Sequence, residues 1–512
     1  MSFYEEKSAL SREKRSGAIS HYHGTLASLI ADAAGDEIPQ RIRTFTQATY
    51  DDILSALIAL RGIRDAAIVV HGAAGCAAAA CALAQAGGAR WYSVNLSERD
   101  SILGSEAPLR EAILRAIAEG AAAVFVVGTP VVAINNDDVN AVLLALEKET
   151  AVPVLHVNTD GFRSKSPLSG FDAALHALLR LVDAPGECGE RDEYGERGER
   201  DERDDSAREA PDGSHPFEPD LSKLLFLPHE TPLDEIKPDG AAQNFVNLLA
   251  VRDNVRNIAA IASIVDALGI NWNLLPGLSS LENIRRAGQA RATVSLNSDE
   301  SEYLGLGLEA AFGTPYLRLP APVGRAATRR LVAGLAEAFG LGDKADVWLR
   351  AQEAALQDVL SARPLAGKKI FLQMDMALVE GFSELIRDLG GELAGVALSS
   401  VDLNNRKHLA RLEAAADIPA LVAVGQPFEV ANVLAKTPVD YYIGPEQVAF
   451  AARFGVKPIS LRGAVYYGYE GMRAFAARIG GPHPDFRERV RGEYTESWLK
   501  KNGGWHVKRE VR

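Results

Sequence analysis

Cysteine is scarce in this sequence of 512 residues, in which it occurs only as Cys76, Cys81 and Cys188. So few thiols give no indication of a disulfide framework and favour a reducing cytoplasm. They also limit metal chemistry, because an ordinary iron–sulfur cluster takes about four thiolate ligands. Cys81 follows Cys76 by five residues, about 140° around a helix, and Cys188 lies in a charged segment. The chain therefore cannot enclose a cluster alone, and any cluster would be shared with another polypeptide.

Long apolar runs and an excess of positive charge are also missing. No run approaches the length of a membrane span, and the first residues, MSFYEEKSALSREKR, lack the apolar core of a signal peptide. The formal net charge is −13, whereas binding to the phosphates of nucleic acid needs a basic face. We therefore expect a cytoplasmic protein whose partners are neither membranes nor nucleic acids.

Several catalytic motifs are absent as well. The sequence has no P-loop, H-E-x-x-H or G-x-S-x-G pattern, so an NTPase, a zincin-type protease and a serine hydrolase have no support. The stretch Val69–Asp100 has the strand, glycines and acidic residues of a nucleotide fold. Its glycines are spaced G-x-x-G, however, rather than G-x-G-x-x-G, which argues against a dinucleotide site.

What the sequence does contain is a repeated strand–helix pattern. Apolar strands, such as residues 67–70, 123–127 and 368–373, alternate with amphipathic helices, which predicts doubly wound parallel sheets. We expect an α/β fold of three Rossmann-like domains around a central cleft, the usual place for a ligand. The expected divisions are an N-terminal helical segment (1–64), domain I (65–185), a charged disordered insertion (186–219), domain II (220–362), domain III (363–480) and a C-terminal tail (481–512).

Two of these divisions are expected to lie outside the domain cores. The insertion contains GECGERDEYGERGERDERDDSAREAPDGSHP, which has almost no apolar residues, so it would remain solvated. A role as a partner-binding arm is the alternative. The tail is polar but carries Trp498 and Trp505, which suggests that it docks on another surface.

The most informative stretch is AIVVHGAAGCAAAA, Ala67–Ala80. Gly72 and Gly75 permit a tight turn after an apolar strand, and Cys76 falls where a helix begins. The unpaired N–H groups and the dipole of a helix N-terminus favour a thiolate. Cys76 is therefore a candidate metal or cluster ligand, and His71 would orient its loop. The alternative is a small buried cysteine that packs as an apolar residue.

Several loops together resemble the nitrogenase component 1 family. HGAAGC at His71–Cys76, GTPVVAINNDDVNAV at Gly128–Val142 and VPVLHVNTDGF at Val152–Phe162 are similar to segments of that family's first domain. TVSLNSDESEYLGLGLEAAFGTPYLRL in the second unit and VDYYIGPEQVAFAARFGVKPISLRG in the third also fit, in the same order. The family includes molybdenum–iron protein subunits, cofactor-assembly scaffolds and dark-operative chlorophyll-pathway reductases.

The resemblance implies an iron–sulfur cluster at a subunit interface. Subunits of this family commonly carry three cysteines around that cluster, and Cys76 matches the middle one. The upstream position falls within TFTQATYDD, where Ala48 and Asp51 stand instead of cysteine. The downstream position falls at Thr129 or Pro130.

Asp51 is the most interesting of these departures. One branch of the family uses an aspartate at its interfacial cluster in this general region, so Asp51 is a second candidate ligand. The alternative is that Asp51 caps the helix that follows, residues 53–60. Asp137 and Asp138 likewise precede an apolar helix pattern and would cap it.

The family's catalytic cofactor is not expected in this chain. Where subunits that hold it have a cysteine ligand in the middle domain, this sequence has about Asn297. Where they have a histidine in the last domain, it has Pro458, which cannot ligate through its side chain. The resemblance therefore implies that any such cofactor lies mainly in a partner.

The function implied by the resemblance is that of a subunit in a nitrogenase-like reductase, with methylthio-alkane reductase as a candidate type. The implied partners are a related component 1 subunit, in an α2β2 assembly, and a dimeric ATP-dependent iron–sulfur reductase. Cys76 and, more weakly, Asp51 would hold the shared cluster. Two alternatives stay open: a non-catalytic cofactor-assembly scaffold or structural paralogue without a cluster, and a tetrapyrrole reductase subunit.

Overall fold

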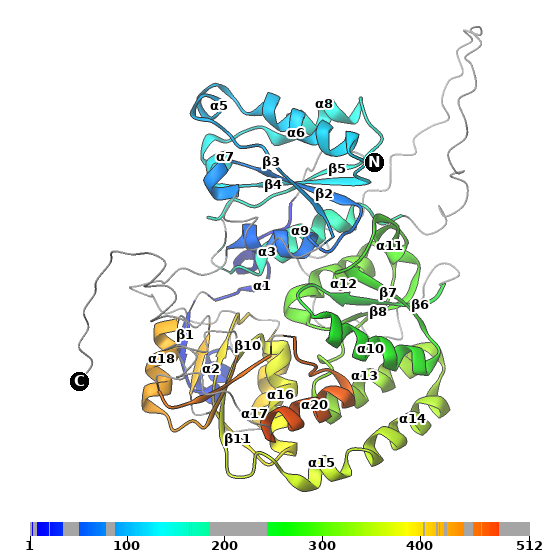
Figure 1. Cartoon of the computed structure of the whole chain (residues 1–512), viewed down its shortest axis with the longest axis vertical. Coiled ribbons are helices and arrows are strands. Elements are labelled where there is room, and N and C mark those ends of the chain that lie inside the picture. Colours follow the sequence, from blue (N-terminus) through cyan, green and yellow to red (C-terminus); the bar gives the residue numbers. More distant parts are fainter. Residues whose placement is uncertain are drawn as a thin grey trace, which may run out of the picture.

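The structure, a computed structural model, contains three β-sheets in the part of the chain that it describes (Figure 1). Among these residues, no helix is both long and apolar enough to cross a membrane. The expected insertion and tail, and with them Cys188, lie outside the described residues, as do Ala48 and Cys81. The described residues are 3, 8–19, 21–33, 51–77, 88–162, 164, 166–183, 243–402, 405–415, 418, 420–423, 427–444, 454–461 and 463–480.

The first sheet has the strand order β3-β2-β4-β5, and every pairing in it is parallel. Its two central strands are buried along their whole length because helices cover both faces. Ile68 and Phe125 pack with α3 and α9 on one face, and Val69 and Val126 pack with α6 and α8 on the other. The elements are α3 (Asp52–Leu60), β2 (Ala66–His71), β3 (Arg90–Ser93), α5 (Glu98–Leu103), α6 (Glu106–Ala118), β4 (Ala123–Gly128), α7 (Pro130–Asn135), α8 (Val139–Glu147), β5 (Val154–Val157) and α9 (Ser169–Leu179).

The second sheet repeats this topology with the order β7-β6-β8-β9, again wholly parallel. Its helix α12 packs on α9, so the apolar core of the first sheet continues into the second domain. The elements are β6 (Gln243–Ala250), α10 (Val255–Leu268), β7 (Asn271–Pro276), α11 (Leu281–Arg285), the 3₁₀ helix η3 (Arg286–Gln289), β8 (Ala290–Ser295), α12 (Ser298–Phe312), β9 (Tyr316–Leu317), α13 (Gly324–Phe339), α14 (Gly342–Ala354) and α15 (Gln357–Ala362).

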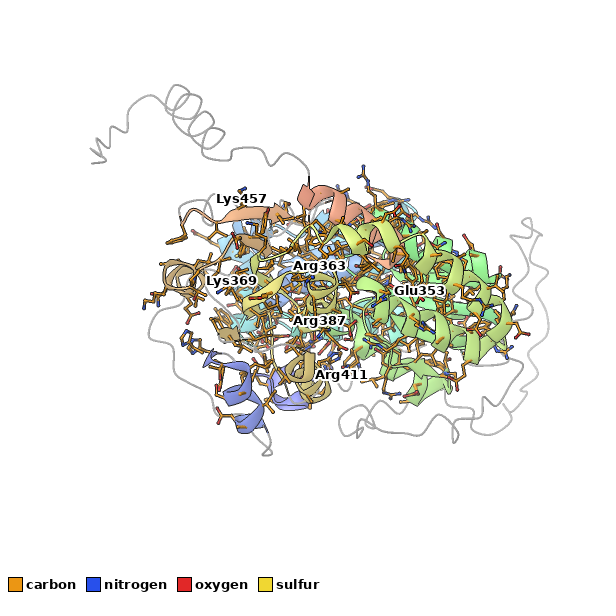
Figure 2. The ribbon with its side chains drawn as sticks, turned by 90° about the horizontal axis from the view of Figure 1, so that it is seen from below. Glu353, Arg363, Lys369, Arg387, Arg411 and Lys457 are labelled. Carbon is orange, nitrogen blue, oxygen red and sulfur yellow. The ribbon has the colours of Figure 1, made fainter. Side chains whose placement is uncertain are left out.

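The third sheet has the order β1-β12-β11-β10-β13-β14. All its pairings are parallel except that of β1, an antiparallel strand from the start of the chain. Figure 2 views the side on which β10 and β14 begin, at Lys369 and Lys457. The elements are β1 (Tyr22–Gly24), α2 (Leu26–Ala33), β10 (Lys369–Met374), α16 (Met376–Asp388), β11 (Glu392–Leu398), α17 (Arg406–Ala415), β12 (Leu421–Ala423), α18 (Pro427–Lys436), β13 (Tyr441–Gly444), β14 (Lys457–Ser460) and α20 (Gly468–Gly480).

The short helix α1 (Arg12–Ser16) contacts all three sheet-bearing units. The Arg12 guanidinium donates to the buried Asp172 of α9 at 2.9 and 3.0 Å. The guanidinium of Arg15 lies 5.2 Å from the ring centroid of Tyr303 in α12, and the Ser16 hydroxyl donates to Asp402, beyond β11, at 2.9 Å. The N-terminal segment, expected to be helical, thus also contributes strand β1 and ties the three units together.

The expected fold class is confirmed. Three doubly wound parallel sheets are present, and the third includes the order β12-β11-β10-β13-β14 typical of Rossmann topology. This order arises because each strand is followed by a crossover helix, and right-handed crossovers place helices on both faces. Ligands in such folds bind beyond the carboxyl ends of the strands, so these edges are where a functional site is sought.

Candidate functional site

The loop after β2 carries Cys76 to the carboxyl edge of the first sheet. Residues 74–77 form the first turn of a helix, and the Cys76 thiol is free and exposed. Exposure contradicts the alternative of a cysteine packed as a buried apolar residue. The position at a helix N-terminus agrees with the sequence-based expectation and places the sulfur where a ligand from outside the chain can reach it.

Thr129 fixes this loop against the end of β4. Its amide and its hydroxyl both donate to the carbonyl oxygen of His71, at 3.1 and 2.9 Å. Gly72 lies so close to it that a β-carbon there would come within 1.8 Å of the Thr129 hydroxyl oxygen. Gly72 is therefore required by close approach, and Thr129, one of the two residues expected at the downstream cysteine position, has a structural role of its own.

Asp51 is exposed and caps α3: its carboxylate accepts a hydrogen bond from the amide of Leu54 at 2.8 Å. The capping role expected as an alternative is therefore present. The next residue, Asp52, is buried and accepts from the amide of Gly161 at 3.0 Å. Burial raises the pKa of Asp52. These contacts fasten the start of α3 to the loop that follows β5.

The N-terminus of α3 and the end of β4 lie at the same edge. A β-carbon on Gly161 would lie 3.3 Å from both the Ile53 side chain of α3 and the ring of Pro130, directly after β4. Asp51, Cys76 and Thr129, which lie in the three segments expected to correspond to the family's cysteine positions, are thus held near the carboxyl ends of β2, β4 and β5. Among the described residues, Cys76 supplies the thiol there, and no group of three or more His, Cys, Asp or Glu side chains is arranged to hold a metal ion.

His71 lies buried beneath this loop in a hydrogen-bonded cluster that the sequence did not reveal. The Ser105 hydroxyl lies 3.1 Å from Nε2 of His71 and donates to Oδ2 of Asp137 at 2.5 Å. Because the single hydroxyl hydrogen goes to the carboxylate, Ser105 must accept from Nε2–H of His71. The imidazole is neutral, since burial lowers the pKa of His71 to about 4 despite the nearby Asp137. No described residue bonds to its Nδ1.

Asp137 and Asp138 have different tasks, although both were expected to cap a helix. Asp138 caps α8 by accepting from the amide of Ala141 at 3.0 Å. Asp137 instead holds Ser105, at the N-cap position of α6. No local spacing links Ser105 to His71, 34 residues away, which is why sequence reasoning missed the cluster.

Apolar side chains are exposed on helices α5 and α7, which lie side by side near this edge. Ile102 is 81% exposed, Leu103 72% and Ile134 71%. The two helices are joined by a hydrogen bond of 2.9 Å from the Asn135 amide to the carbonyl of Ser101. Exposed apolar side chains grouped on adjacent elements are typical of a protein–protein contact surface.

Asn297, expected near the position of the family's cofactor cysteine, belongs to an ion-pair network between domains II and III. Its side-chain amide donates to Oδ2 of Asp375 at 2.9 Å. Arg252 donates to the same oxygen at 2.7 Å and to Glu300 at 2.6 Å. Arg252, Asn297 and Asp375 follow β6, β8 and β10, so three carboxyl strand ends are joined by direct contacts.

Burial controls the charge of this network. Desolvation raises the pKa of Glu300 to about 8 and that of Asp253 to about 6. Burial would also raise the pKa of Asp375, but Arg252 and the hydrogen bond from Asn297 outweigh it, so that pKa is lowered. Asp375 is thus the ionised partner of Arg252.

These residues do not fit the family's catalytic cofactor. Asn297 offers no thiolate, and its amide nitrogen is engaged by Asp375. Pro458, expected near the position of the family's histidine ligand, is paired with Tyr442 inside the third sheet and has no donor atom on its side chain. Neither position can supply the bond that such a cofactor needs.

The three doubly wound sheets define an α/β protein built from three Rossmann-like units. The family model of the Nitrogenase component 1 type Oxidoreductase matches residues 52–482, and the chain belongs to this family.

Individual relatives are distant. The nitrogenase iron-molybdenum cofactor biosynthesis protein NifE of Methanococcus maripaludis is 22% identical over 347 residues, 64% of this chain and 62% of the relative. The chain thus spans less than two thirds of that relative's length. One of the subunits of the light-independent protochlorophyllide reductase of Jannaschia sp. is 28% identical over 182 residues, 35% of this chain and 34% of the relative.

The fold has a counterpart among solved structures. That of nitrogenase Cp1 at pH 6.5 superposes with a TM-score of 0.67 at 17% sequence identity and covers 94% of this chain and 100% of the other. At this identity the likeness establishes a common fold.

Proposed function

We propose that this chain is one subunit of a nitrogenase-like reductase and contributes Cys76 to an iron–sulfur cluster shared with a second component 1 subunit. A dimeric ATP-dependent iron–sulfur reductase would supply the low-potential electrons to this α2β2 assembly. The observation that carries the proposal is the exposed Cys76 thiol at the meeting point of β2, β4 and α3, where the described residues offer no complete ligand set.

The cluster, when bound, would accept and release electrons singly. This chain's own residues hold the Cys76 side chain in place. Thr129 and Gly72 fix the loop that carries Cys76, and the hydrogen bond between Ser105 and His71 fixes the end of the preceding strand. Asp51 is the weaker second ligand. Its Oδ1 is committed to the amide of Leu54, which leaves Oδ2 for another partner.

The exposed surface of α5 and α7 supports the need for a partner. Ile102, Leu103 and Ile134 would leave water on docking, and burial of apolar area is the main favourable term in association. A second polypeptide bound there would also limit the access of water to the neighbourhood of Cys76, and solvent exposure is one of the factors that set a cluster's potential. The catalytic cofactor would lie mainly in the partner, because Asn297 and Pro458 cannot hold it here.

The proposal is tested by anaerobic purification of the chain with its co-expressed partner subunit. We expect iron and acid-labile sulfide in the complex, a cluster signal in low-temperature EPR, and reduction of that cluster by the ATP-dependent reductase. A partner-bound complex that is free of iron would overturn the proposal.

A cofactor-assembly scaffold is the second candidate, and it is favoured by the similarity to NifE. A scaffold would bind a metal cofactor transiently and pass it to an acceptor protein, whereas a reductase would turn over substrate with its reductase partner. The similarity to the light-independent protochlorophyllide reductase supports a third candidate, a tetrapyrrole reductase. Binding of a coloured macrocycle by the purified complex would identify that candidate.

A further inference from the structure

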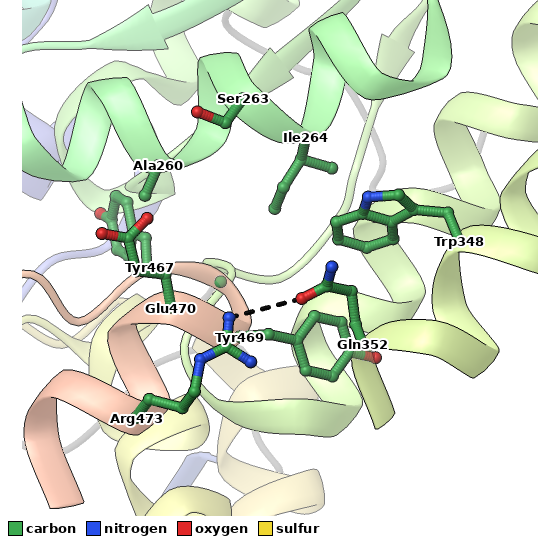
Figure 3. Close-up of a pocket in the computed structure, with 10 residues that line it drawn as sticks. Ala260, Ser263, Ile264, Trp348, Gln352, Tyr467, Tyr469, Glu470 and Arg473 are labelled. Carbon is green, nitrogen blue, oxygen red and sulfur yellow. Dashed lines mark hydrogen bonds between the residues drawn. The ribbon is translucent and has the colours of Figure 1, made fainter. Parts of the chain in front are cut away.

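A cavity of about 190 Å³ lies between α10, α14 and α20 (Figure 3). Helix α10 belongs to the second domain, and α20 closes the third, so the cavity lies at a domain junction. Cavities at such junctions are common ligand sites, and this one suits a ligand smaller than a drug-sized molecule. It is remote from the cluster site and is independent of the proposed function.

Aromatic and apolar side chains line one part of the cavity, and polar side chains line the rest. The rings of Trp348 and Tyr469 meet edge to face, with centroids 5.7 Å apart, and the buried Ile264 lies opposite Trp348. Gly468, with a φ of +70°, forms part of the wall, and a β-carbon there would lie 3.2 Å from Ile264. These surfaces can receive an apolar or aromatic side chain.

Two opposite charges stand at the rim without pairing with each other. Glu470 and Arg473 are three residues apart on α20, a spacing at which opposite charges usually pair on a helix. Among the described residues, no ion pair joins them, and no residue bonds to the exposed Glu470 carboxylate. In the described part of the chain, the Arg473 guanidinium donates only to Oε1 of Gln352, at 3.4 Å, which leaves most of its hydrogens without a partner there.

We propose that this cavity binds a small zwitterion with an apolar side chain, namely a free α-amino acid. The ammonium group would bind Glu470, the carboxylate would bind Arg473, and the side chain would lie between Trp348, Tyr469 and Ile264. This ligand class satisfies both unpaired charges at once, which an anion, a cation or a neutral apolar molecule does not. Charge-assisted hydrogen bonds at both ends would give selectivity for the intact zwitterion.

Calorimetric titration of the full chain, in complex with its partner if the complex is the stable form, tests the proposal. The probes are L-phenylalanine and L-leucine, compared with L-phenylalaninamide, which lacks the carboxylate, and N-acetyl-L-phenylalanine, which lacks the ammonium group. We expect saturable binding of at least one amino acid, and dissociation constants about tenfold or more higher for both blocked forms. Absence of saturable binding, or equal binding of the blocked forms, would overturn the proposal.

Substitutions locate the site independently. Glu470→Gln and Arg473→Gln should each raise the dissociation constant about tenfold or more, whereas Arg478→Gln, exposed on the same helix, should leave it unchanged. Binding that both cavity variants leave intact would place the amino acid elsewhere. If a variant fails to fold, the comparison of blocked and free amino acids on the unmodified chain still decides the question.

Discussion

Gly72 and Thr129 are in such close contact that no side chain fits at Gly72: a β-carbon there would lie 1.8 Å from the Thr129 hydroxyl oxygen. The same hydroxyl donates to the carbonyl of His71, so the contact joins the end of β2 to the end of β4. The turn that presents Cys76 is therefore held by backbone geometry and one polar side chain. The contribution of this contact to the stability of the fold can be measured with substitutions at Gly72.

Gly72→Ala should reduce the free energy of unfolding by about 1–3 kcal/mol, because the added methyl group displaces Thr129 or the strand end. Gly75→Ala is the matched control, since a β-carbon there has no neighbour within 4 Å and the residue is helical. Chemical denaturation of both variants provides the measurement. Equal effects of the two substitutions would contradict the close contact.

Ser105→Ala should destabilise the fold by about 1–3 kcal/mol, because it leaves the buried Nε2–H of His71 without its acceptor. Ser101→Ala, on the neighbouring exposed helix, removes a hydroxyl bonded to its own helix carbonyl and should have little effect. The two unfolding curves are compared at neutral pH. Coincident unfolding curves for the two variants would show that the hydrogen-bonded cluster of His71, Ser105 and Asp137 does not stabilise the fold.

The pH dependence of stability should reflect Glu300. Its pKa is raised from 4.5 to about 8 in the folded chain, so the folded state holds a proton that the unfolded state has lost. Stability from this group is complete below about pH 4.5 and is lost as the pH rises towards 8, by at most about 1.4 kcal/mol per pH unit. Glu300→Gln should flatten the slope of unfolding free energy between about pH 6.5 and 8.

The control for this slope is Glu337→Gln, an exposed position on α13. It should leave the pH dependence unchanged. The window above pH 6.5 also avoids His71, whose lowered pKa of about 4 removes stability only as the pH falls from 6.5 through that value. If the unfolding free energy of Glu300→Gln and that of the original chain change equally with pH, Glu300 is ionised in the folded state.

We expect the exposed apolar surface on α5 and α7 to take part in binding the partner subunit or the reductase. Ile102→Asp and Ile134→Asp should weaken association with the partner subunit or the reductase by about tenfold or more, since a charge would be buried in the contact. Val347→Asp changes a side chain of comparable exposure on α14 and is the control. Sedimentation or surface-binding measurements report the affinity. Unchanged affinity for both variants would exclude this surface.

Local signals made much of the fold predictable from the sequence. Helix α10 (Val255–Leu268) is an example, because Asn254 caps its first turn, the apolar period is regular and Gly269 ends it in a left-handed conformation. The Asp51 cap was predictable for the same reason. Strand β1 was not, since three residues carry no periodic signal and the strand exists only through pairing with β12.

The candidate site was predictable only in part. HGAAGC identified Cys76 because strand, glycine turn and helix start are adjacent in sequence. Ser105 and Arg252 act through partners 34 and 48 residues away, and no spacing rule connects them to His71 and Glu300. Such contacts form because crossover connections bring the ends of separate strands to one edge of a sheet. Which strand ends become neighbours depends on the order of the strands in the sheet, and the local sequence pattern does not reveal that order.

The iron content of the Cys76→Ala variant tests the central claim most directly. The variant is purified anaerobically with its partner, beside Cys81→Ala as the matched cysteine control, and iron, sulfide and EPR signal are measured per complex. The account predicts loss of most of the iron and of the cluster signal in Cys76→Ala, with both retained in Cys81→Ala. Full iron content and an unchanged signal in Cys76→Ala would contradict it.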